Sequence, residues 1–203
     1  MKLYTSVGPN PRVVNVFAAE LGMSLDQETI DIMAGENRQA AYKEINPGAQ
    51  SPALMLDDGS VVSEITAICE YLAELSGGSS LIGLTPEARV VTRMWGRRID
   101  LGIVEPLANG FRSSEGAPMF KDRMRIIPHA ADDLKAMAQD KIQWLDGLIA
   151  GREYVCGDDF TLADIMLGVF LEFGAQVGQP IDSNNANIVA WYERIKVRPS
   201  FAG

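Results

Sequence analysis

Two short segments carry groups that would recognise the ends of an amino-acid-like or peptide-like molecule. Ser51-Pro52 opens an apparent strand, and a cis bond there would present the Ser51 backbone N–H and C=O to an extended ligand. An ordinary trans turn is the alternative. Farther on, Ser63 is expected to cap a helix whose first-turn N–H groups attract a carboxylate, while Glu64 pairs with an ammonium. A plain cap followed by a first-turn acid is the alternative at that position.

A third motif carries no chemistry. Thr161 and Asp164 have the spacing of a capping box, and Phe160 stands where a hydrophobic staple begins. We therefore expect Asp164 to matter for stability only.

The elements that would position these residues differ between the two halves of the chain. Up to about residue 76, short strand patterns alternate with helical ones, and Asp57-Asp58-Gly59 is a strong hairpin signal. The order βαβ followed by ββα predicts a thioredoxin-like domain. The expected strands are 2–5, 28–32, 53–56 and 60–62, and the expected helices are 11–21, 39–45 and 63–75.

The second half shows helical periodicity alone. Long apolar stripes predict helices over 85–111, 134–149, 162–177 and 188–195. Gly77-Gly78-Ser79-Ser80 reads as the start of a linker. The predicted organisation is an α+β two-domain protein with a thioredoxin-like domain over 1–77, a linker over 78–85 and an all-helical domain over 86–203.

Composition excludes several classes of function. The formal net charge is −9, with 18 basic against 27 acidic residues, which argues against nucleic acid as a partner. Two cysteines and one histidine predict neither a disulfide framework nor a metal site. Cys69, Cys156 and His129 are therefore expected to be structural. No signal peptide and no apolar run of roughly 18 residues is found, so a cytoplasmic, non-membrane protein is expected.

Taken together, the motifs resemble the glutathione transferase family. The family pattern is a cis-proline after Asn-Pro, a D-G hairpin, Glu-Ser at the next helix start and a Phe-Thr-Leu-Ala-Asp capping box. Here these correspond to Asn46-Pro47 with Pro52, Asp58-Gly59, Glu64-Ile65 and Phe160–Asp164. The resemblance covers essentially the whole chain, including 94–98 and 106–112, which look like segments of bacterial members.

The resemblance implies a glutathione site, with glutathione as co-substrate and no metal. Ser51, between Gln50 and Pro52, would pair its backbone with the cysteinyl part, and Glu64 with the helix start at Ile65 would hold the γ-glutamyl end. Arg12 and Arg38 are candidates for the ligand carboxylates; a solvated surface charge is the alternative for Arg38. The family usually has Ser or Thr where this chain has Ile65, which removes a hydroxyl contact of about 1.5–3 kcal/mol.

The resemblance also implies a donor to the glutathione sulfur in the loop after the first strand. A thiol with a pKa near about 8.5 is mostly protonated at neutral pH, so the anion must be stabilised. Asn10 is the first candidate, Ser6 the second and Tyr4 the third, because a side chain within the strand could simply pack. A cap without catalytic role is the alternative for Asn10. Residues 4–12 contain no Cys, which disfavours chemistry through a mixed disulfide with the protein.

The expected activity is conjugation of the glutathione thiolate to a hydrophobic electrophile, with glutathione-dependent peroxide or disulfide chemistry as a further option. The electrophile would lie between the domains, against Trp95, Ile103 and Phe111, although these residues could equally be core. A homodimer is implied, joining the first domain of one subunit to the helical domain of the other. The alternative is a non-catalytic binding or regulatory module of the same fold.

Overall fold

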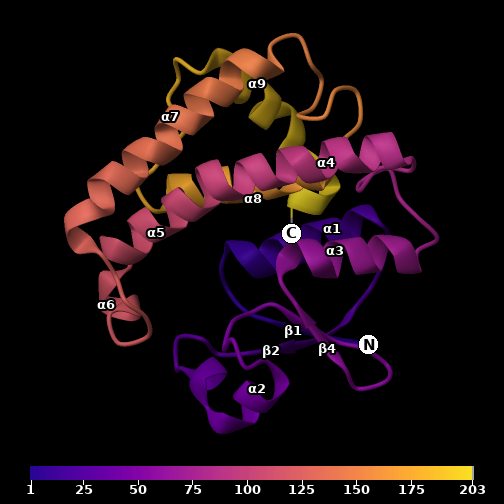
Figure 1. The fold of residues 1–203 in the computed structure, drawn as a ribbon, viewed down its shortest axis with the longest axis vertical. Helices are drawn as coiled ribbons and strands as arrows, with labels where there is room; N and C mark the ends of the chain where they lie inside the picture. The colour runs from indigo at the N-terminus through magenta and orange to yellow at the C-terminus, as the bar shows by residue number, and fades with distance from the viewer. Residues whose placement is uncertain (203) are drawn as a thin grey trace. The chain divides into compact units, whose positions relative to one another are not determined.

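The computed structural model describes residues 1–202, which form two compact units, Met1–Ile82 and the chain from Gly83 onward (Figure 1). The first unit combines a sheet with helices and the second is helical. The predicted fold class, a thioredoxin-like domain followed by a helical domain, is confirmed.

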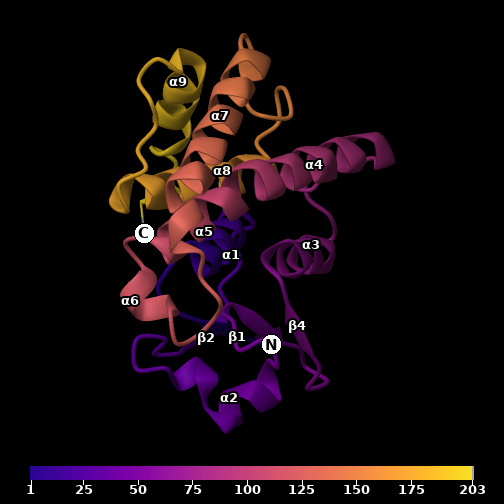
Figure 2. The same cartoon turned by 60° about the vertical axis from the view of Figure 1, so that its left-hand side comes forward.

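The first unit is built on a mixed sheet of order β2-β1-β3-β4. β1 and β2 are parallel, whereas β3 is antiparallel to both β1 and β4. Helices α1 and α3 lie on one side of the sheet and α2 on the other (Figures 1 and 2). The elements are β1 (Lys2–Thr5), α1 (Pro9–Glu20), β2 (Asp26–Thr29), the short 3-10 helix η1 (Glu36–Arg38), α2 (Ala40–Ile45), β3 (Ala53–Met55), β4 (Val61–Ser63) and α3 (Ile65–Leu75).

The strand register brings the predicted site segments to one end of this sheet. Tyr4 pairs with Ala53, and Ala53 pairs with Ser63. The carboxyl ends of β1 and β4 therefore meet the amino end of β3. Since side chains alternate across a strand, Leu3 and Leu54 point away from the face on which Tyr4 and Ala53 pack, and both are fully buried.

Several boundaries in this unit differ from the sequence expectation, and β2 differs most. The predicted strand 28–32 is wrong, because pairing with β1 in parallel register places β2 at Asp26–Thr29. All four residues of β2 are exposed, so its sequence lacks the alternation of apolar and polar residues that predicts a strand. Ile30 follows it and is buried, its N–H donating to the Thr5 carbonyl at 2.8 Å. Helix α1 begins at Pro9 rather than Pro11.

The second unit is a bundle around α8 (Leu162–Gln176), which is buried along most of its length. The other elements are α4 (Pro86–Ile99), η2 (Asp100–Val104), α5 (Glu105–Ser113), α6 (Ala117–Phe120), η3 (Pro128–Ala130), α7 (Ala131–Ile149), α9 (Ala186–Ile195) and η4 (Pro199–Phe201). Within residues 1–202, none of the helices combines the length and apolar character that a membrane span requires.

The single helix predicted over 85–111 is interrupted by a π-helical segment, η2. The Glu105 N–H donates to the Asp100 carbonyl, one residue farther back than in an α-helix. Pro106 follows directly, and in a regular α-helix its ring would clash with the Gly102 carbonyl. The wider π turn accommodates the proline, so α4, η2 and α5 remain one continuous rod (Figure 1).

The predicted capping box at the start of α8 is present. The fully buried Asp164 carboxylate accepts hydrogen bonds from the Thr161 N–H at 3.0 Å and the Thr161 hydroxyl at 3.1 Å. It also accepts from the Val155 N–H at 2.8 Å and the Trp191 indole N–H at 2.9 Å. The motif thus joins α8, α9 and the preceding loop inside the helical unit.

Candidate functional site

The Ser51–Pro52 peptide bond is cis, as the first of the two sequence interpretations requires. The Ser51 hydroxyl lies 3.5 Å from the Tyr4 carbonyl oxygen, which places this segment beside the end of β1. Among residues 1–202, the backbone N–H and C=O of Ser51 have no hydrogen-bond partner. A half-buried residue therefore offers one donor and one acceptor of its main chain to an extended ligand.

The carbonyl groups just before Ser51 accept hydrogen bonds from three buried side chains, and for two of these, Asn37 and Tyr42, the sequence carries no signal. The Asn37 amide donates to the Ala49 carbonyl at 2.7 Å. The Tyr42 hydroxyl and the Asn46 amide both donate to the Gln50 carbonyl at 2.8 Å. Burial raises the pKa of Tyr42 to about 12, so its hydroxyl remains a donor at neutral pH.

The start of α3 differs from the expected cap. Ser63 lies in β4 and does not cap the helix; the N-cap residue is Glu64, which makes no side-chain cap hydrogen bond. Glu64 has φ 73°, a left-handed backbone conformation that non-glycine residues adopt at a cost and that clusters at ligand sites. Glu64 is exposed and directly precedes the first turn of α3, whose N–H groups, beginning with Ile65, have no acceptor within the helix. The carboxyl-bearing residue and the free donors of the helix start thus follow one another directly in the chain.

At the start of α1, Asn10 lies inside the first turn. The alternative in which it is the N-cap is wrong, because that position is Gly8, with φ 118°. Pro9 and Pro11 have no backbone N–H. Asn10 is therefore the one residue of the three that offers a main-chain donor, and its side-chain amide makes no hydrogen bond within residues 1–202.

The other two candidates for the thiol contact are placed differently. Ser6 is half-buried after β1, and its hydroxyl donates to the Val7 carbonyl at 3.3 Å. Tyr4 is 6% exposed, its ring meets the Tyr42 ring edge-on, and its hydroxyl contacts the Met55 sulfur at 4.0 Å. Tyr4 thus packs in the core cluster with Ile30 and Ala53.

The residues predicted to bind the carboxylates of the ligand lie at separate places in the first unit. Arg12 is half-buried in the first turn of α1, while Arg38 is exposed at the end of η1. The Gln50 side chain is exposed beside Ser51.

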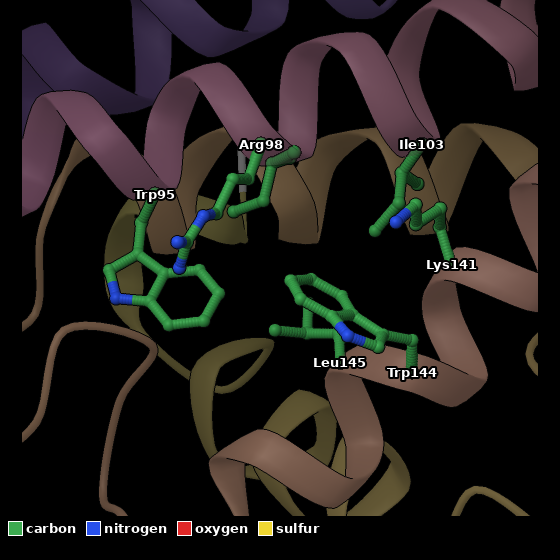
Figure 3. Close-up of a pocket in the computed structure, with 7 residues that line it drawn as sticks. Trp95, Arg98, Ile103, Lys141, Trp144 and Leu145 are labelled. Carbon is green, nitrogen blue, oxygen red and sulfur yellow. The ribbon is translucent and has the colours of Figure 1, made fainter.

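The predicted electrophile residues do not form one group. Trp95 and Ile103 are both buried, and they line a shallow depression between the α4–η2 rod and α7 that has no room to enclose even a water molecule (Figure 3). The Trp95 and Trp144 rings lie 6.2 Å apart, with the Arg98 guanidinium 4.9 Å from the Trp95 ring and the Lys141 ammonium 4.5 Å from that of Trp144. Phe111 is elsewhere, packed edge-on against Phe173 at 5.2 Å and Phe120 at 6.0 Å.

The remaining side chains with reactive groups are Cys69, Cys156 and His129. Burial raises the pKa of the Cys69 thiol far above its usual range. Burial also raises the pKa of Cys156, whose sulfur lies 3.3 Å from the Thr161 hydroxyl oxygen. His129 is exposed in η3.

This arrangement defines a class: a thioredoxin-like domain with a main-chain site at a strand-opening cis-proline, followed by a helical domain. Family models described as the N-terminal and C-terminal domains of glutathione S-transferase match residues 7–75 and 128–194.

Individual relatives agree with the family models. Glutathione S-transferase 2 of Saccharomyces cerevisiae is 30% identical over 200 residues, covering 97% of this chain and 85% of the relative. Glutathione S-transferase GstA of Escherichia coli O157:H7 is 26% identical, covering 98% and 94%. The crystal structure of a glutathione S-transferase domain-containing protein from Marinobacter aquaeolei superposes with a TM-score of 0.93 at 32% identity, covering 99% of this chain and all of that one. The chain belongs to the glutathione S-transferase family.

Proposed function

We propose that this protein is a glutathione transferase that conjugates the glutathione thiolate to a hydrophobic electrophile. The observation that carries the proposal is the unpaired main-chain edge of Ser51 beside the end of β1. An extended peptide pairs with such an edge as an added strand, the Ser51 N–H donating to the cysteinyl carbonyl and the Ser51 C=O accepting the cysteinyl N–H.

The other residues of this sheet end suit the two ends of glutathione. The Glu64 carboxylate would pair with the γ-glutamyl ammonium, and the first-turn N–H groups of α3 would bind its carboxylate. Arg12 and Arg38 are the candidate cations for the ligand's carboxylates, and Gln50 borders the cysteinyl part.

The thiol contact is assigned to Asn10. Its backbone N–H and side-chain amide are two donors at a helix N-terminus, where the helix dipole also favours negative charge. Stabilising the thiolate lowers the thiol pKa, so that the sulfur attacks the electrophile at neutral pH. With an aryl chloride, the C–S bond forms at the chlorine-bearing carbon and chloride leaves.

Trp95 and Ile103 remain the candidates for contact with the electrophile, whereas Phe111 is engaged in an aromatic cluster of its own. We also propose a cytoplasmic homodimer with a role in detoxification. Exposed apolar residues on the α4–η2 rod, namely Val90, Met94 and Leu101, favour a surface that a second subunit covers. Light scattering during size-exclusion chromatography would test the dimer, and a monomer at micromolar concentration would refute it.

The primary test measures binding and turnover on the same preparation. Calorimetric titration with glutathione is followed by conjugation to chlorodinitrobenzene, with wild type, Asn10→Ala and the control Asn15→Ala. Asn15 lies on the same helix and instead accepts a hydrogen bond from the Gln27 amide at 3.1 Å. We expect millimolar or tighter binding, and a conjugation rate that Asn10→Ala lowers about tenfold or more while raising the kinetic pKa of the bound thiol.

Each other outcome has a defined meaning. Unchanged turnover in Asn10→Ala would exclude the side-chain amide and leave the backbone N–H of residue 10 or the Ser6 hydroxyl, which Ser6→Ala distinguishes, since the Tyr4 hydroxyl faces Met55. Absence of glutathione binding by the wild type would refute the enzyme and favour a non-catalytic module that shares the fold.

A further inference from the structure

Three buried side chains donate hydrogen bonds to the loop that precedes Ser51. Asn37, Tyr42 and Asn46 are 8%, 3% and 5% exposed, and all donate to main-chain carbonyls of this loop. The Gln50 carbonyl receives two of these bonds, so both of its lone pairs are used. Asn46 also fixes the turn itself, its side-chain oxygen accepting the Gly48 N–H at 3.0 Å.

The geometry of the peptide group extends this restraint to Ser51. The Gln50–Ser51 bond is trans, so the Gln50 C=O and the Ser51 N–H belong to one plane and point in opposite directions. Because Tyr42 and Asn46 fix the carbonyl from the buried side, the N–H must point away from them. That N–H is the donor with no partner among residues 1–202.

We infer that Tyr42 and Asn46 are positioning residues for glutathione, which act by aiming the Ser51 N–H at the ligand's cysteinyl carbonyl. This inference rests on the proposed function. Without the two donors, the 50–51 peptide plane is free to rotate. Glutathione binding must then order this plane, which costs conformational entropy, whereas in the wild type the plane is already fixed. The effect should fall on glutathione affinity, since both side chains bond the Gln50 carbonyl and the thiol contact is assigned to Asn10.

The test uses the full-length protein and two variants that each remove one donor. Tyr42→Phe deletes the hydroxyl but keeps the ring that packs against Tyr4. Asn46→Asp keeps the acceptor for the Gly48 N–H but loses the donor to the Gln50 carbonyl. Tyr154→Phe is the matched control, because it makes the same chemical change in the helical unit. Circular dichroism and thermal unfolding establish that each variant is folded at the assay temperature.

We expect Tyr42→Phe to raise the Kd and KM for glutathione about tenfold, the scale of one hydrogen bond. The kcat at saturating glutathione and the KM for chlorodinitrobenzene should stay within about twofold of wild type. Asn46→Asp should weaken glutathione binding at least as much at pH 7.5 and recover part of it toward pH 5.5, because burial of this position and the facing Gln50 carbonyl raise the pKa of the new carboxyl group above its usual value of about 3.9, so that the group gains a proton and can donate. A merely structural role would not produce that pH dependence.

The inference is overturned if either folded variant binds glutathione within about twofold of wild type at pH 7.5, or if Asn46→Asp shows the wild-type pH profile. It is also overturned if Tyr42→Phe changes the kcat and the KM for chlorodinitrobenzene as strongly as the KM for glutathione, because that pattern reports general disruption. Failure of the wild type itself to bind glutathione is a different result and refutes the proposed function.

Discussion

Asp164 offers the sharpest test of how the helical unit is held together. Replacing it with Ala leaves three buried N–H donors without their acceptor, those of Val155, Thr161 and the Trp191 indole. The parent residues are 0%, 2% and 2% exposed, so water cannot readily replace the carboxylate. An unsatisfied buried donor costs about 1–3 kcal/mol, and partial relaxation of the loop reduces the sum. We expect the free energy of unfolding to fall by about 4 kcal/mol.

Urea unfolding followed by tryptophan fluorescence measures this loss directly. All three tryptophans lie in the helical unit, at positions 95, 144 and 191, so the signal reports on that unit. Asp164→Asn should cost less than Asp164→Ala, because its amide oxygen can still accept from Val155 and Trp191. Neither change should alter glutathione affinity in the folded protein.

The matched control is Asp159→Ala in the same loop. Asp159 is exposed, and substitutions at such positions usually change stability by less than about 0.5 kcal/mol. If Asp164→Ala and Asp159→Ala unfolded within about 1 kcal/mol of each other, the hydrogen bonds at Asp164 would not stabilise the fold as argued.

Three further predictions address other parts of the molecule. Gly83→Ala should lower the unfolding free energy by about 2–4 kcal/mol in the urea titration. Gly83 has φ +91°, and a Cβ there would lie 2.4 Å from the backbone nitrogen of Arg89. The control is Gly147→Ala on α7, where a Cβ meets nothing within 4 Å, and this change should be neutral or stabilising. Hydrogen bonding to Lys135 lowers the pKa of Glu115 to about 2, so its contribution is present above the ordinary carboxyl pKa and is lost as pH falls toward 2. The stability gap between wild type and Glu115→Gln should thus be at most about 1 kcal/mol at pH 7 for this exposed pair and should shrink below about pH 4.5; a gap that widens on acidification would contradict the assignment. Ile65→Thr should tighten glutathione binding about tenfold, because the new hydroxyl can donate to the γ-glutamyl carboxylate. Calorimetry measures the affinity, and an unchanged value would show that this carboxylate does not reach residue 65.

The sequence predicted most elements of the first unit because strong local signals mark them. Asp58-Gly59 marks the hairpin, and the apolar spacing from Ile65 to Leu75 predicts α3. β2 was misplaced because its four residues are all exposed and its position depends on pairing with β1. Such pairing is a contact between distant parts of the chain, which local periodicity does not report.

In the candidate site, too, residues with a local sequence signal could be predicted and residues that act through distant contacts could not. Ser51, Pro52 and Glu64 could be proposed from the sequence because a proline at a strand start and an acid at a helix start have recognisable local roles. Tyr42 was missed because its hydroxyl acts on a carbonyl eight residues along the chain, and no spacing rule associates a helical tyrosine with a downstream turn. Asn46 carried a faint signal, since Asn before Pro-Gly favours a turn, but its second bond to Gln50 depends on the loop's three-dimensional path.

The π segment between α4 and α5 bears on which changes of length the chain can tolerate. A π turn is equivalent to an α-helix that has gained one residue, and each residue in a regular helix corresponds to about 100° of rotation. Because the i→i−5 turn takes up that extra residue, deleting one residue from Asp100–Val104 would restore a regular rod and leave the buried face of α5, including Leu107, nearly in place, but it would press Pro106 against the carbonyl four residues before it. The extra residue therefore makes room for the proline at 106 while the two halves of the rod keep their phase, so a deletion in this segment should be tolerated only together with replacement of Pro106.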